Sequence, residues 1–260
     1  MESINVPVEF YGKIVDQDGA PLADARVLGE TLHLKVVAPI PGGAQDEIIP
    51  IDQKTGPDGR FEIRGITGRA VQIESIQKDG YEMEPTPRNH NVTEGSFSSP
   101  VIFKMWSSNI HEQLITGGNK FEIVPDGRPY FINLTSGTIA ESGSGDLKVW
   151  IKYPAQVTHG QWYDWSCEID AINGGLSEQS LGTVLYLAPT DGYLPSFQLQ
   201  QQIKGGQYGE IGERHFYVKL KGGKEYGQIA INLCAPYTDQ IPGLIRLSYV
   251  VNPSGSRILH

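Results

Sequence analysis

Short runs in which apolar and polar residues alternate follow one another along most of this chain. Phe10, Gly12 and Ile14 alternate with more polar neighbours, as the residues of a half-buried strand do. The same period recurs after the turn formers Asp18-Gly19 and Pro57-Asp58-Gly59, which favour tight connections between strands. No long apolar stripe with a helical period is present in the sequence. The pattern therefore predicts an all-β protein.

The pattern also predicts two β-sandwich domains, which a chain of 260 residues has the length to form. We expect the first domain at residues 1–106, a connector at 107–120 and the second domain at 121–260. Strands of the second domain are predicted at 129–134, 147–153, 162–172, 182–187, 215–221, 227–233 and 244–251. Short strands separated by turn signals are typical of a jelly roll or an immunoglobulin-like sandwich.

Residues 31–55 lie between two predicted strands of the first domain. We expect them to form a hairpin insertion, with strands at 32–37 and 47–51 joined by a loop rich in Pro and Gly. A hairpin of this kind is either a contact element or tolerated surface decoration. Residues 1–7 are expected to form a lead-in arm.

Three stretches of the first domain carry a further signal. They read GKIVDQDGAPLADARV at 12–27, DGRFEIRGITG at 58–68 and KDGYE at 78–82. Together they resemble the carboxypeptidase regulatory-like domain, a transthyretin-like β-sandwich, and the resemblance extends over residues 6–106. It implies a fold and no activity, because such modules are mostly non-catalytic spacers and binding units. The HxxE zinc-ligand spacing of the carboxypeptidases is absent from the sequence.

Two stretches of the second domain carry a resemblance as well. YDWSCEIDAINGGLSE at 163–178 and HFYVKLKGGKEYGQIAI at 215–231 resemble an uncharacterised β domain of exported bacterial proteins. This resemblance implies no activity and no functional residues.

Charge and composition exclude some classes of partner. A formal net charge of −9 argues against nucleic acid or an anionic membrane surface, since both select basic proteins. No apolar run is long enough to span a bilayer, and no signal peptide is visible at the start. The chain is therefore either cytoplasmic or a mature exported segment. The resemblance favours export to the cell envelope or the extracellular space.

Disulfide and metal chemistry are not predicted. Cys167 is in phase with Trp165 and Ile169, whereas Cys234 is out of phase with Leu233. The two sulfurs are therefore expected on different sides of their sheets, as separate small hydrophobes. The histidines show no HxH or HExxH spacing, so we predict no metal site and no cofactor.

Outward-facing aromatic and acidic residues of the second domain remain as candidates for binding. Trp150 is out of phase with its apolar neighbours, and Trp162, Asp164 and Glu168 share the outward face of the next strand. An exposed indole flanked by carboxylates and amides suits a sugar ring. The alternative is that both tryptophans pack against the other domain or another subunit. Arg257 is a further candidate binding residue: it is expected either to hold the carboxylate of Asp164 or Glu168 and so pin the tail, or to act as a ligand clamp.

Three functions follow from these observations. The leading hypothesis is a non-catalytic structural or adhesive module that acts through protein–protein contacts, as a homo-oligomer or with other envelope proteins. The first alternative is a carbohydrate-binding module that uses Trp150 and Trp162. The second is a glycan-active hydrolase, because outward residues two apart on a strand, such as Glu168 and Asp170, stand about 7 Å apart. No catalytic residue is predicted under the leading hypothesis.

Overall fold

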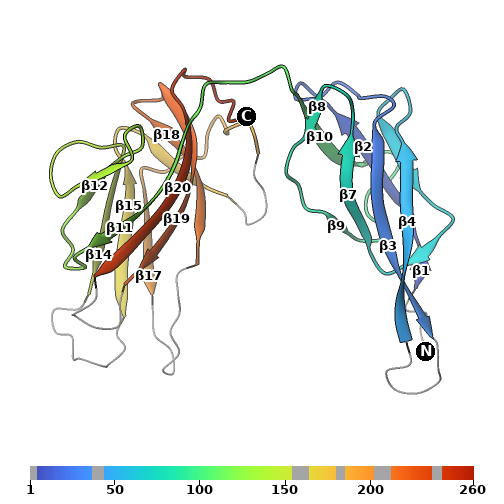
Figure 1. Ribbon diagram of the computed structural model, residues 1–260, viewed down its shortest axis with the longest axis horizontal. Coiled ribbons are helices and arrows are strands. Elements are labelled where there is room, and N and C mark those ends of the chain that lie inside the picture. The colour runs from blue at the N-terminus through green and yellow to red at the C-terminus, as the bar shows by residue number, and fades with distance from the viewer. Residues whose placement is uncertain (1–4, 37–43, 154–163, 180–184, 202–211, 236–241) are drawn as a thin grey trace. The chain divides into compact units, whose positions relative to one another are not determined.

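The computed structural model describes residues 5–36, 44–153, 164–179, 185–201, 212–235 and 242–260. Every regular element in these residues is a β-strand, which confirms the all-β prediction (Figure 1). The chain divides into two compact units, one that ends at His111 and one that begins at Glu112. Each unit is a β-sandwich whose sheets enclose a separate hydrophobic core. Within the described ranges, no helix is long and apolar enough to cross a membrane.

The first unit packs two four-stranded sheets against each other. One has the order β5 (Arg60–Ile63), β2 (Phe10–Val15), β10 (Val101–Ser107) and β8 (Tyr81–Met83). The other has the order β4 (Ala44–Lys54), β3 (Arg26–Val36), β7 (Val71–Gln77) and β9 (Asn89–His90). A short pair, β1 (Val6–Pro7) with β6 (Thr67–Gly68), lies beside them. Alternate residues of the strands, among them Phe10, Ile14, Val27, Ile73 and Phe103, form the core.

The predicted hairpin insertion is part of the main sheet. β3 runs without a break and pairs with β4 from Arg26 to Val36, and Ile51 of β4 is buried in the core. Gly29 lets β7 pass close beside β3, because a Cβ atom there would come within 2.1 Å of the Gln72 carbonyl oxygen. The described residues of the predicted insertion, 31–36 and 44–55, therefore extend this sheet and supply its edge strand; the predicted loop between them lies outside the described residues.

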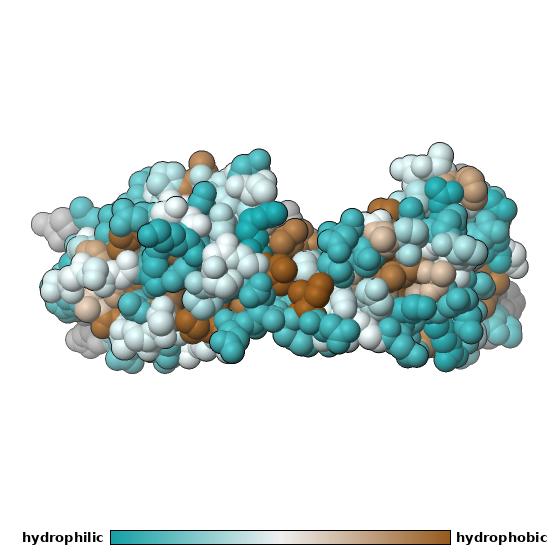
Figure 2. Space-filling view, turned by 90° about the horizontal axis from the view of Figure 1, so that it is seen from above, coloured by the Kyte–Doolittle hydropathy of each residue, from teal (hydrophilic) through white to brown (hydrophobic). Residues whose placement is uncertain are grey.

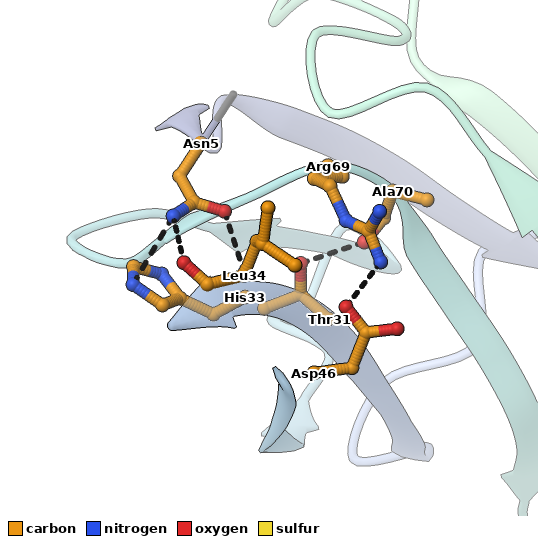
Figure 3. A network of polar contacts seen from close by, with 7 residues as sticks. All are labelled: Asn5, Thr31, His33, Leu34, Asp46, Arg69 and Ala70. Carbon is orange, nitrogen blue, oxygen red and sulfur yellow. Dashed lines mark hydrogen bonds and ion pairs between the residues drawn. The ribbon is translucent and has the colours of Figure 1, made fainter. Parts of the chain in front are cut away.

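The segment that precedes β1 is tied to this extended sheet. Asn5 Nδ2 donates to the Leu34 carbonyl oxygen at 2.9 Å, and Leu34 N–H donates to Asn5 Oδ1 at 2.8 Å (Figure 3). The side-chain amide thus pairs with β3 as a neighbouring strand would. Arg69 forms an ion pair with Asp46 of β4 nearby. The described part of the predicted arm and the predicted hairpin are therefore one structure.

The second unit packs two five-stranded antiparallel sheets. One has the order β11 (Ile115–Ile123), β20 (Gly243–Asn252), β19 (Glu225–Cys234), β18 (Arg214–Leu220) and β16 (Gly175–Glu178). The other has the order β13 (Thr138–Ala140), β12 (Tyr130–Asn133), β14 (Leu147–Lys152), β15 (Trp165–Ala171) and β17 (Ser196–Gln201). The core between them includes Ile132, Val149, Cys167, Phe216, Ile231 and Ile245.

The second unit begins earlier than predicted. Residues 115–120, expected in the connector, belong to β11, which pairs with β20 from Ile115 to Ile123. Its alternation is weak in the sequence because Gly117 and Gly118 carry no side chains. The prediction also lacks β13, β16 and β17. Residues 182–184 of the predicted strand 182–187 lie outside the described residues, and Leu187 makes an isolated bridge to Ile258.

The cysteines have the predicted phases. Cys167 is buried in the core of the second unit, whereas Cys234 is half-buried and out of phase with Leu233. Their sulfurs are not bonded to each other. Burial raises the pKa of the Cys167 thiol to about 12.

The outward sides of the sheets are largely polar. On the face shown in Figure 2, hydrophobic residues lie in small groups among hydrophilic ones, as expected for strands that bury every second side chain. The exceptions with an exposed large apolar side chain include Ile48, Phe97, Ile102, Val124 and Leu194.

Candidate functional site

The candidate site is the outward face of β14, β15 and β17, which we call the Trp150 face. In β14, Leu147, Val149 and Ile151 are buried, so Lys148, Trp150 and Lys152 lie on the other side. β15 and β17 have the same alternation, and the strands pair in register. The face therefore consists of three cross-strand rows: Lys148–Asp170–Ser196, Trp150–Glu168–Gln198 and Lys152–Ser166–Gln200.

The central row is held by two hydrogen bonds to one carboxylate. Trp150 Nε1 donates to Glu168 Oε2 at 2.8 Å, and Gln198 Nε2 donates to Glu168 Oε1 at 2.9 Å. Because Glu168 belongs to the neighbouring strand, the indole of Trp150 reaches across the sheet. The bonds from Gln198 and Trp150 hold the pKa of Glu168 below its usual value of 4.5, against the opposing effect of partial burial. Glu168 is therefore ionised at neutral pH.

The flanking rows are charged and polar. Lys148 forms an ion pair with Asp170, and this hydrogen-bonded contact raises the pKa of Lys148. Lys152, Ser166 and Gln200 complete the third row. One aromatic ring thus lies among ammonium, carboxylate, hydroxyl and amide groups, each of which can exchange hydrogen bonds with a polar ligand.

A pocket of about 350 Å³ adjoins the third row. Asp164 lines it, together with Tyr153 and Gln201. Trp165 also contributes to its wall, and the buried Nε1 of Trp165 has no hydrogen-bond partner within the described part of the chain. A buried N–H group without a partner is costly.

The structure brings some of the predicted residues together and separates others. Trp150 and Glu168 are hydrogen-bonded, and Asp164 lies at the adjoining pocket. Trp162 lies outside the described residues. Arg257 does not pair with Glu168, since its Nη1 donates to the Ala188 carbonyl oxygen at 2.6 Å.

The position of Arg257 follows from the pairing of the tail. Ala188 N–H donates to the Arg257 carbonyl oxygen at 2.9 Å, and Leu259 N–H donates to that of Tyr186 at 2.7 Å. Leu259 and Ala188 form a small apolar cluster with Tyr217 of β18, in the other sheet of the sandwich. The tail is pinned, as predicted, but by the segment from Tyr186 to Ala188.

Ser196, Gln198 and Gln200 are the residues of this face that the sequence prediction misses. Their strand, β17, is absent from it, although Phe197 and Leu199 alternate with them and pack against the core. That alternation is the available signal. Tyr217 and Tyr226 belong to β18 and β19 of the other sheet and so are not part of this face. Among the described residues, no cluster of His, Cys, Asp or Glu side chains is placed to hold a metal ion.

Comparison with known proteins assigns no family to the chain. No protein-family model matches it, and no curated protein matches it. A solved structure, the apo form of an HmuY analog from Tannerella forsythia, matches with 14% sequence identity and a TM-score of 0.31. The match covers 55% of this chain and 98% of the other. A likeness this distant carries no argument about the site.

Proposed function

We propose that this chain is a non-catalytic, adhesive binding protein of the cell envelope or extracellular space, and that its second unit binds carbohydrate on the Trp150 face. The observation that carries the proposal is the bond from Trp150 Nε1 to Glu168, with Gln198 on the same carboxylate. It fixes an aromatic ring across a polar sheet face before any ligand arrives. A ring held in place costs less conformational entropy on binding than a mobile one.

The surrounding groups suit the hydroxyls of a sugar. The apolar side of a pyranose stacks on an indole, while its hydroxyls both donate and accept hydrogen bonds. Lys152, Ser166 and Gln200 offer such partners in the next row. The pocket lined by Asp164 extends the face beyond that row, which favours an oligosaccharide over a single sugar.

The hydrolase alternative has weaker support. A glycosidase needs one carboxyl group that stays protonated, with a raised pKa, to act as general acid. The pKa of Glu168 is lowered instead, and Asp170 is paired with Lys148. Export is supported by the resemblance of residues 6–106 to carboxypeptidase regulatory-like domains, and that resemblance remains an expectation from the sequence.

A glycan array probed with the whole chain tests the proposal. We expect binding to one class of oligosaccharide, at least tenfold weaker for Trp150→Ala, as roughly expected for the loss of one stacking aromatic contact. Phe97→Ala is the matched control, because it removes an exposed ring (67% exposed) from the first unit. The proposal fails if no glycan is bound across a broad array, or if both variants bind as the wild type does.

A further inference from the structure

The side chain of Asn5 connects the segment before β1 to the ring of His33 as well as to the backbone of β3. Asn5 Nδ2 lies 3.2 Å from His33 Nε2 (Figure 3), and the same amide exchanges two hydrogen bonds with Leu34. The proposed function uses none of these groups. We call the cluster of Asn5, His33, Leu34 and Thr67 the Asn5 latch.

The backbone of Leu34 fixes the orientation of the Asn5 amide. Leu34 N–H can only donate, so the Asn5 atom that it meets at 2.8 Å is the side-chain oxygen. The Leu34 carbonyl can only accept, so the Asn5 atom that it meets at 2.9 Å is the side-chain nitrogen. An amide nitrogen carries two hydrogens. Asn5 Nδ2 therefore has a second hydrogen to donate, and it faces the His33 ring with a donor.

Thr67 fixes the position of the proton on the His33 ring. His33 Nδ1 lies 3.1 Å from the Thr67 carbonyl oxygen and 3.1 Å from the Thr67 hydroxyl oxygen. A carbonyl oxygen only accepts, so Nδ1 carries the proton and donates. In the neutral ring the other nitrogen, Nε2, then has no proton and accepts from Asn5 Nδ2. One tautomer of neutral histidine thus satisfies the whole latch.

Protonation of His33 breaks this match. Both ring nitrogens of a histidinium are donors, so Nε2–H would point at an N–H of Asn5 across 3.2 Å. The amide cannot turn over to offer its oxygen to the ring, because its oxygen would then meet the Leu34 carbonyl and its nitrogen the Leu34 N–H. The contact between the ring and the amide is therefore lost when the ring gains a proton.

The charged groups around the ring have partners of their own. Glu47 lies directly opposite His33 in β4. Neither β1 nor β6 contains a charged residue. The neighbouring charges form two ion pairs, Glu47 with Lys35 and Asp46 with Arg69. The proton on His33 Nε2 is therefore the charge change that acts directly on Asn5.

We propose that the Asn5 latch is a pH-sensitive device, which holds the segment before β1 on β3 while His33 is neutral and releases it when His33 is protonated. Histidine changes its charge between about pH 5 and 8, so the segment is docked at the upper end of this range and released at the lower end. Val8 is buried in the core, so the release ends before it. Release uncovers the N–H and C=O groups of Leu34, and unpaired groups of this kind allow a further strand to add to a sheet.

Hydrogen exchange of the whole chain, followed by NMR, measures the latch at one of its own amides. Leu34 N–H donates to Asn5 Oδ1, so its protection factor, corrected for the intrinsic effect of pH on exchange, reports docking. We expect this protection factor to fall roughly tenfold from about pH 8 to about pH 5, because one hydrogen bond is lost and two donors meet. The Ala25 amide, which donates to the Thr55 hydroxyl, should keep its protection.

Four variants separate the latch from other effects of pH. His33→Gln cannot take up a proton, so the protection of Leu34 should become independent of pH. Asn5→Ala removes the acceptor of the Leu34 amide, whose protection should be low at both ends of the range. His111→Gln removes an exposed histidine of the same unit, and Glu47→Gln removes the carboxylate opposite His33. Both of these controls should keep the fall in protection.

Nitrogen chemical shifts of the His33 ring give a second readout. At about pH 8 they should show the proton on Nδ1, and a proton on Nε2 overturns the proposal. So does a Leu34 protection factor that is the same at both ends of the pH range. A fall that persists in His33→Gln, or one that disappears in Glu47→Gln, also overturns it.

Discussion

Trp150 Nε1 lies 2.8 Å from Glu168 Oε2, and this bond joins β14 and β15 on the outward side of their sheet. The same carboxylate accepts a hydrogen bond from Gln198 of β17. One acidic side chain therefore links three strands and sets the position of the Trp150 indole on this face. Its ionisation state and the order of the face are coupled.

Replacement of Glu168 by glutamine should lower stability in a pH-dependent manner. The pKa of Glu168 is lowered in the folded protein, so its contribution is present above the ordinary value of 4.5 and disappears as pH falls through the folded value. We expect the wild type to melt at a slightly higher temperature than Glu168→Gln at pH 7. Once the pH is below the pKa of Glu168 in the folded protein, the two should melt together.

A second substitution tests whether the hydrogen bond from Gln198 stabilises the charge of Glu168. Gln198 supplies the largest effect on the pKa of Glu168. In a Gln198→Leu background, the loss of stability caused by Glu168→Gln should therefore shrink, as a double-mutant cycle measures. An unchanged loss would mean that Gln198 does not stabilise the charge of Glu168.

Thr55→Val should destabilise the first unit. Thr55 is 4% exposed, and its hydroxyl accepts from the Ala25 N–H at 2.9 Å and donates to the Leu22 carbonyl oxygen at 2.7 Å. Valine has nearly the same shape and leaves both backbone groups without this partner, at a cost of about 1–3 kcal/mol. The loss in free energy of unfolding is measured by urea denaturation monitored by tryptophan fluorescence. Trp106 reports on the first unit. Thr116→Val, at an exposed threonine of β11, should change the free energy of unfolding by less than about 0.5 kcal/mol.

Pro50→Val should promote pairing between sheet edges. Pro50 lies in the edge strand β4, opposite Glu30 of β3. β4 pairs with β3 from Ala44 to Lys54. Proline cannot donate a backbone hydrogen bond, and edge strands carry it where a neighbour would otherwise pair. We expect the variant to bind thioflavin and scatter light at concentrations where the wild type does neither. Pro87→Val, in an exposed loop, should behave as the wild type; equal aggregation of both variants would remove the protective role of Pro50.

Cys167 should resist alkylation in the folded protein. Its thiol is buried and has a pKa of about 12, and only the thiolate reacts with iodoacetamide. At pH 8, mass spectrometry of a digest should show Cys167 unmodified in buffer and modified in denaturant. Rapid labelling in buffer would show that the core around β15 opens to solvent.

The local alternation of apolar and polar residues determined many of the strands of this protein and the side of each strand that is buried. The alternation in Leu147–Lys152 and in Trp165–Ala171 assigned both strands, the buried faces and the outward positions of Trp150 and Glu168. This is possible because side chains alternate across a strand whatever its neighbours are. The phase of each cysteine followed from the same rule. The carbohydrate and self-association hypotheses remain predictions.

Sheet order was decided only by the tertiary structure. Gln198 lies 30 residues from Glu168 in the chain and becomes its partner because β17 pairs with β15. Arg257 was expected beside Asp164 or Glu168, but its side chain bonds to Ala188, because the tail pairs with the segment from Tyr186 to Ala188. Periodicity states which side of a strand a residue occupies, whereas its neighbours depend on which strands pair and in what register, and those are properties of the whole sandwich.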